Sequence, residues 1–151
     1  MNKPKAIGTR GESAVVKACR TRGFPGAERV ALHGSYDQGD VRLTTGLTAG
    51  ILLEIKSGQA ARTASDNQII AWLEETEVER VNAGAAYGFL VTARAGVGPA
   101  NAHKWWTHIP VGTFLDILDA PQIIGPGPGV IRMTLDTLLG ILTATGWGDP
   151  Q

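Results

Sequence analysis

The sequence Gly50-Ile51-Leu52-Leu53-Glu54-Ile55-Lys56, with Gly39-Asp40-Val41 before it, decides the fold that this chain can adopt. Side chains alternate between the two faces of a strand, so Glu54 and Lys56 lie side by side on one face. The other face is wholly apolar and can enter a core, with Ile51, Leu53 and Ile55. Asp40 closes the preceding candidate strand and comes alongside Glu54 if the two strands pair.

Two carboxylates and a lysine at adjoining strand ends can hold a divalent cation and position a water molecule. That donor set suits phosphodiester hydrolysis. Asp37 is a rival for the first carboxylate, and Asp40 is preferred because it directly precedes the strand-like Val41. The simpler alternative is that Glu54 and Lys56 form an exposed ion pair, which contributes little to stability.

Composition points to a folded chain of ordinary polarity. It has 151 residues, 43% hydrophobic and 19% charged, enough for one domain with its own core. No apolar run approaches the roughly 20 residues that cross a bilayer, and no secretion signal is visible. Cys19 is the only cysteine, which excludes an internal disulfide and CxxC metal sites. We expect a cytoplasmic protein without membrane association, of cellular, viral or prophage origin.

Charge is divided unevenly although the net charge is zero. Residues 1–56 carry nine basic and five acidic residues, and the remainder carries five basic and nine acidic. The division predicts a basic surface for a polyanion such as DNA. Chance clustering is the alternative.

Periodicity and turn residues predict the order of the elements. A capping box, Thr9-Arg10-Gly11-Glu12, predicts a helix that begins there and stops near Gly23. Three strands follow at 28–33, 41–45 and 51–56. After a loop at 57–65, a helix from Ser65 or Asp66 to about Asn82 leads to a buried strand at 86–92, parallel to the third strand. The remaining segments predict a loop at 96–102, a helix at 113–118, a break at 125–129, a strand at 130–133 and a helix at 135–143.

We also predict which way individual side chains of the two main helices point. Glu12 is either an N-terminal capping carboxylate or an acid pointed inward at the metal site. The second helix is expected to bury Ile69, Ile70, Leu73 and Val81. Its acidic residues should mostly face solvent, namely Glu74, Glu75, Glu77 and Glu79.

The order helix, three strands, helix, strand with D…E-x-K on the central strands resembles the PD-(D/E)XK nuclease superfamily. Within it the chain looks most like the archaeal-type Holliday junction resolvases, over about residues 8–94. The matching positions are Gly8 to Glu12, Gly23-Phe24, Arg29, Gly34-Ser35, Asp40, Glu54-Ile55-Lys56, Ser57 and Gln68. Gly39 replaces the proline of the family motif, and residues 96–151 have no counterpart. We therefore expect a single nuclease domain, 1–151, with a C-terminal extension from about residue 96.

The resemblance implies an α/β, restriction-endonuclease-like core: a central mixed β-sheet flanked by helices. It also implies a metal-dependent endodeoxyribonuclease that resolves four-way DNA junctions by paired symmetric nicks, as a homodimer. Mg²⁺, with Mn²⁺ as a substitute, would be held by Asp40, Glu54 and the Ile55 carbonyl, with Glu12 completing the shell. Lys56 would orient or deprotonate the water or stabilise the transition state, and Gln68 would act behind these ligands.

Several residues are candidates for DNA contact. They are Arg10, Lys17, Arg20, Arg29, Ser35 and Arg62, although Ser35 also reads as a turn residue. Trp105 and Trp106 favour a core or subunit contact over base stacking. His33, His103 and His108 lack metal-ligand spacing. The alternatives to a resolvase are a nuclease of the same fold for other duplex or branched DNA, and a DNA-binding module without catalysis.

Overall fold

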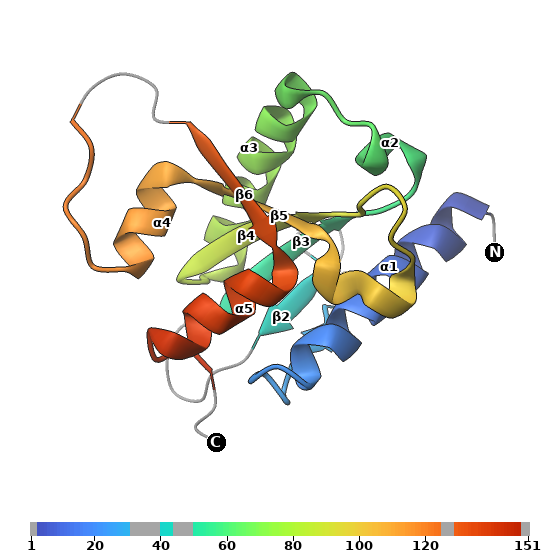
Figure 1. Cartoon of the computed structure of the whole chain (residues 1–151), viewed down its shortest axis with the longest axis horizontal. Coiled ribbons are helices and arrows are strands. Elements are labelled where there is room, and N and C mark those ends of the chain that lie inside the picture. The colour runs from blue at the N-terminus through green and yellow to red at the C-terminus, as the bar shows by residue number, and fades with distance from the viewer. Residues whose placement is uncertain (1–2, 31–39, 44–49, 125–128, 149–151) are drawn as a thin grey trace.

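The computed structural model describes residues 3–30, 40–43, 50–124 and 129–148. Its centre is a six-stranded mixed sheet in the order β1-β2-β3-β4-β5-β6, flanked by helices (Figure 1). The strands are β1 (Glu28–Arg29), β2 (Val41–Leu43), β3 (Ile51–Lys56), β4 (Tyr87–Thr92), β5 (Trp106–Pro110) and β6 (Val130–Thr134). The chain is thus of the α/β class, as expected.

Strand pairing follows the order of the chain. β1, β2 and β3 pair antiparallel, and the helix α3 (Asp66–Ala83) then carries the chain to β4, which lies parallel to β3 as predicted. β5 and β6 extend the sheet antiparallel to β4. The segment from residue 96, predicted to be a C-terminal extension, therefore supplies two strands of the same sheet.

The two faces of the sheet are covered by different helices. On one face, Ile51, Leu53 and Ile55 join a buried core with side chains of α1 (Lys3–Arg20) and α5 (Leu135–Ala144). On the other face α3 packs against β3 and β4. Gly88 permits this approach, because a Cβ there would lie 3.2 Å from Arg80 Cβ. Figure 1 shows α3 at the top of the view and α1 and α5 at the bottom.

The start of α1 differs from the prediction. The helix begins at Lys3, so Thr9 and Glu12 lie inside it and the predicted capping box does not form its N-terminus. A contact with the end of β3 accompanies the extra turns, since the Ser57 hydroxyl donates to the Ile7 carbonyl at 3.3 Å. The predicted stop holds: α1 ends at Arg20, and Gly23 follows with a φ of +93°.

The helices α3 and α5 begin at their predicted capping residues. Ser65 caps α3, its side chain accepting from the Gln68 amide at 3.2 Å, and Thr134 caps α5 in the same way.

Two short helices occupy segments predicted as loops: α2 (Gln59–Arg62) and the 3-10 helix η1 (Pro99–Lys104). The helix predicted at 113–118 is α4 (Val111–Ile117). Predicted strand residues 31–33 and 44–45, the loop at 34–39 and most of the break at 125–129 lie outside the described residues.

The buried side of α3 was predicted wrongly in part. Ile70 and Val81 are 48% and 62% exposed, whereas Thr76 and Glu79 are 2% and 5% exposed. The reason is the contact with β4: Gly88 leaves space that Thr76 fills, and this sets the rotation of the helix. Glu79 consequently turns inward, unlike the exposed Glu74, Glu75 and Glu77.

Two further properties bear on the class of protein. In the described part of the chain, no helix is long and apolar enough to cross a membrane. Cys19 is a buried free thiol, and burial raises its pKa to about 12. The thiol is therefore a core side chain and not a nucleophile at neutral pH.

Candidate active site

Asp40 is fixed between β1 and β3 by both its backbone and its carboxylate. Its amide donates to the Leu53 carbonyl at 3.2 Å, and its carbonyl accepts from the Val30 amide at 2.9 Å. Oδ2 of Asp40 accepts from the amide of Ile55 at 2.8 Å. The predicted pairing of the two strands therefore brings Asp40 beside the residue that follows Glu54.

Glu54 and Lys56 share the face of β3 that α3 covers. Glu54 is 6% exposed, so it is not the surface ion pair of the simpler alternative. The Lys56 ammonium lies 3.4 Å from Oε1 of Glu54 and 3.2 Å from Oε2 of Glu75 on α3. Burial lowers the pKa of Lys56, but the charges and hydrogen bonds of Glu54 and Glu75 outweigh it, so the pKa is raised. Lys56 is a fixed cation beside the carboxylates.

Glu12 reaches the same region from α1. Its Oε2 accepts from Arg29 of β1, at 2.9 Å from Nε and 2.8 Å from the second guanidinium nitrogen. Glu12 lies well beyond the first turn of α1, so the capping interpretation is wrong. Its charge acts on Asp40, which favours the interpretation of Glu12 as an acid directed at the site.

The carboxylates repel one another. Burial, followed by the charge of Glu54, raises the pKa of Asp40 to about 8, and Glu12 adds to the shift. The Ile55 amide opposes it but does not cancel it. In the described ranges no three His, Cys, Asp or Glu side chains form a group that could hold a metal ion. Asp40 and Glu54 are nevertheless two hard oxygen ligands whose repulsion, when both are ionised, a divalent cation that keeps part of its water shell would relieve.

The residues of α3 that contact Lys56 are not the one that was predicted to act near it. Gln68 is exposed in the first turn, and its side chain makes no hydrogen bond to another described residue. Sequence reasoning missed Trp72, whose ring lies 5.6 Å from the Lys56 ammonium, and assigned Glu75 only to the solvent face. A signal was available, because Gln68, Trp72 and Glu75 stand at i, i+4 and i+7 and so share one face of the helix.

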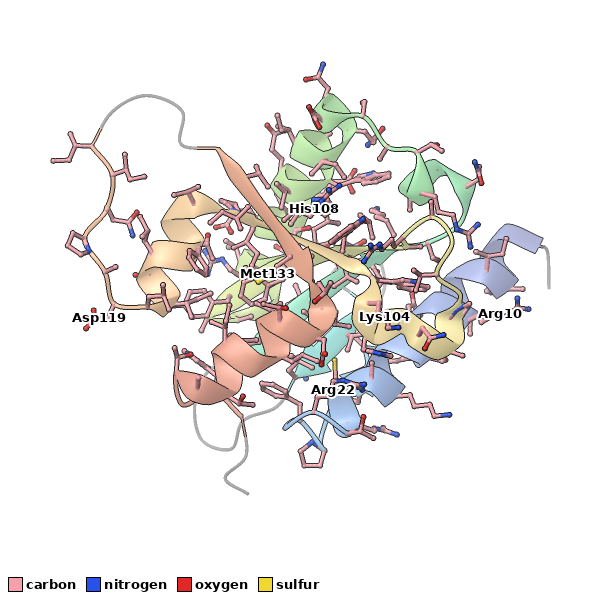
Figure 2. The ribbon with its side chains drawn as sticks, viewed as in Figure 1. Arg10, Arg22, Lys104, His108, Asp119 and Met133 are labelled. Atoms are coloured by element: carbon pink, nitrogen blue, oxygen red, sulfur yellow. The ribbon has the colours of Figure 1, made fainter. Side chains whose placement is uncertain are left out.

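The predicted DNA contacts are scattered. Arg10 and Lys17 are exposed on α1 (Figure 2 labels Arg10), and Arg20 donates to the Ala27 carbonyl at 2.8 Å. Arg29 is engaged by Glu12. Arg62 is exposed at the end of α2. Ser35 lies outside the described residues, as do the rival ligand Asp37 and the turn that holds both.

Trp105 and Trp106 lie on opposite faces of the sheet. Trp105 is 1% exposed and its indole N–H donates to the Val97 carbonyl at 2.9 Å, so it is a core residue. Trp106 lies on the face of Glu54 and Lys56, because it pairs with Thr92 and Thr92 pairs with Lys56. His108 follows on that face, buried, with Nε2 2.8 Å from the Thr92 hydroxyl.

Comparison with protein-family models, with curated proteins and with solved structures finds no match to this chain. The geometry of the site therefore carries the functional argument.

Proposed function

We propose that the protein is a Mg²⁺-dependent endodeoxyribonuclease, with Asp40, Glu54 and Lys56 as its catalytic residues. The observation that carries the proposal is the placement of two crowded carboxylates and a lysine ammonium at the adjoining strands β2 and β3. Two carboxylates that repel each other when ionised, held on a rigid sheet, favour a bound divalent cation.

Each residue of the site has a distinct task. Asp40 and Glu54 would hold the cation, with the carbonyl of Ile55 as the third oxygen proposed from the family pattern. When bound, Mg²⁺ supplies neutralisation of phosphate charge and a water of lowered pKa. The Ile55 amide keeps one oxygen of Asp40 oriented, and a bound cation would displace the hydrogen bond between Asp40 and Glu12.

Lys56 and Glu12 surround the two ligands. The Lys56 ammonium is positioned by Glu54 and Glu75 to stabilise the negative charge that builds up on the phosphate. Glu12 approaches from α1 and would complete the shell directly or through water, once its contact with Arg29 yields.

We further propose that the fold is of the PD-(D/E)XK type and that the substrate is a four-way DNA junction. The order α1, β1, β2, β3, α3, β4, with β3 and β4 parallel, supports the fold assignment. The sequence pattern around Glu12, Asp40 and Glu54 supports the junction. Two symmetric cuts require two identical sites, so the active form would be a homodimer with twofold symmetry.

The test is cleavage of a labelled four-way junction beside a linear duplex that contains the same arms. Paired symmetric nicks on the junction alone, dependent on Mg²⁺ and abolished by EDTA, support the proposal. Equal cutting of both DNAs indicates a general nuclease. Tight binding without cutting indicates a DNA-binding module and overturns the assignment of catalysis.

A further inference from the structure

A groove runs along the face of the sheet that carries Glu54 and Lys56, between α3 and the strands β5 and β6. It encloses about 910 Å³. Trp106, His108 and Thr92 form its sheet side, and Ile69 and Leu73 of α3 form an apolar wall. Thr92 of the groove pairs with Lys56 of the candidate site on the neighbouring strand, so the two lie on the same face of the sheet.

Two arginines flank Trp106: Arg132 lines the groove with it, and Arg94 lies against the same ring from beyond the lining. The guanidinium carbon of Arg94 lies 4.0 Å from the centre of the Trp106 ring, and that of Arg132 lies 4.2 Å from it. Arg94 comes from the end of β4 and Arg132 from β6, the strands on either side of β5. The two guanidiniums therefore sandwich the indole, and the ring is not available for base stacking.

The sandwich brings two like charges together on one ring. Within the described ranges, neither Arg94 nor Arg132 has a carboxylate at ion-pair distance. The hydrogen bond of Arg94 is to the Lys104 carbonyl at 3.4 Å. Stacked guanidiniums keep their N–H edges free, and those edges match phosphate oxygens.

The opposite wall of the groove is acidic and apolar. Asp66, Glu74 and Glu77 line it together with Ile69 and Leu73, and Glu77 is paired with Arg80. Phosphates are therefore favoured on the sheet side, and the apolar surface of α3 suits the faces of bases. Base faces are exposed only where a strand is unpaired.

The groove and the candidate active site are close enough to share one strand. Lys56 pairs with Thr92, which pairs with Trp106, so the sandwich is two strands away from Lys56. At roughly 4.8 Å for each strand step, this is on the order of 10 Å. A short segment of one DNA chain spans that distance.

We propose that this groove binds an unpaired segment of the DNA strand next to the cleaved phosphate. Arg94 and Arg132 contact its phosphates, and its bases lie against Ile69 and Leu73. The inference rests on the proposed nuclease function for the origin of the strand, but the binding itself requires neither cation nor cleavage.

Binding of a fluorescent oligothymidylate, measured by anisotropy in EDTA over a range of salt concentrations, tests the groove. In R94Q/R132Q we expect affinity to fall roughly tenfold and the salt slope to decrease by about 1.4, since each phosphate contact on a single strand contributes about 0.7. R94K/R132K keeps both charges and should retain most of the binding. R22Q is the matched control, because Arg22 pairs with Asp136 near α1 and α5 (Figure 2).

Junction cleavage by the same variants separates the two proposals, and thermal unfolding confirms that each variant is folded. If R94Q/R132Q and R22Q bind the oligonucleotide equally well, the groove proposal is wrong even when the wild-type protein cleaves. If the arginines govern binding and the wild-type protein never cleaves, the groove stands and the nuclease function fails. Equal loss of affinity for a blunt duplex would overturn the preference for unpaired DNA.

Discussion

The backbone amide of Ile55 donates to Oδ2 of Asp40 at 2.8 Å, which ties the residue before β2 to the C-terminal end of β3. The bond fixes the Asp40 carboxylate relative to Glu54, because its donor is the backbone of β3 and not another side chain. It also keeps Asp40 in place although burial and the neighbouring charge oppose its ionisation. The site thus holds Asp40 in a fixed position close to Glu54, and a cation would relieve the repulsion between the two carboxylates.

Mg²⁺ should stabilise the folded protein, because a ligand that binds only the native state raises the free energy of unfolding. The pKa of Asp40 is about 8, so below this pH a proton must leave before the cation binds. We therefore expect the Mg²⁺-induced rise in Tm to be larger at pH 9 than at pH 6.

The control for this shift is D40N, which keeps the size of the side chain and removes the charge. Its Tm in EDTA at pH 9 should equal or exceed that of the wild-type protein, because the repulsion between ionised Asp40 and Glu54 is gone, and Mg²⁺ should leave it unchanged. Equal Mg²⁺ shifts in both proteins would place the cation elsewhere.

Lys56 should matter for the reaction and not for holding the cation. Substitution of Lys56 by Met removes the ammonium beside Glu54 but leaves both carboxylates, so cleavage should fall by about 100-fold, the effect of losing one preorganised donor. The Mg²⁺ shift in Tm should persist. K104M, which removes an exposed lysine from η1, is the control. Loss of the shift in K56M would show that Lys56 organises the cation site instead.

Gly11 allows α1 to approach the end of β3. A Cβ at Gly11 would lie 2.7 Å from Oγ and 2.9 Å from Cβ of Ser57, whereas Gly8 has no atom that close. We expect G11A to be destabilised by about 1 kcal/mol or more, because overpacking exceeds the gain in helix propensity. G8A should gain about 0.5–1 kcal/mol from propensity alone. Chemical denaturation measures both, and a stabilised G11A would mean that α1 sits farther from β3.

His108 should make the fold sensitive to acid. Burial, followed by the charge of Arg132, lowers the pKa of His108 from 6.5 to about 4. Between these pH values the unfolded chain binds a proton that the folded chain does not, so stability rises with pH across this window and is lost as the pH falls.

Substitution of His108 by Gln tests this dependence by urea unfolding from pH 4 to 7. The variant should show a shallower slope than the wild-type protein, by up to about 1.4 kcal/mol for each pH unit. H103Q, which replaces a half-buried histidine of η1, is the matched control. If the free energy of unfolding of H108Q varied with pH as steeply as that of the wild-type protein, other groups would control the loss of stability at low pH.

Local patterns predicted the elements that local chemistry determines. The alternation in residues 51–56 predicted β3, and Ser65 and Thr134 predicted the starts of α3 and α5, since capping depends on a few adjacent residues. The pairing of Asp40 with β3 followed from the strand order. The parallel placement of β4 followed from the intervening helix.

Long-range contacts account for what the sequence did not predict. The capping box at Thr9 lies inside α1 because the helix continues over the end of β3, where Ile7 meets Ser57. The rotation of α3 depends on Gly88, a residue beyond the helix itself. The pairing of Lys56 with Glu75, and the sandwich around Trp106, required strands and helices to meet first.

The most direct measurement is cleavage of a labelled four-way junction by the wild-type protein and by D40N, with Mg²⁺ and with EDTA. We predict paired symmetric nicks from the wild-type protein with Mg²⁺ only, and at least about 100-fold slower cleavage by D40N. Full Mg²⁺-dependent cleavage by D40N, or no cleavage of any DNA by the wild-type protein, would contradict the assignment of this site.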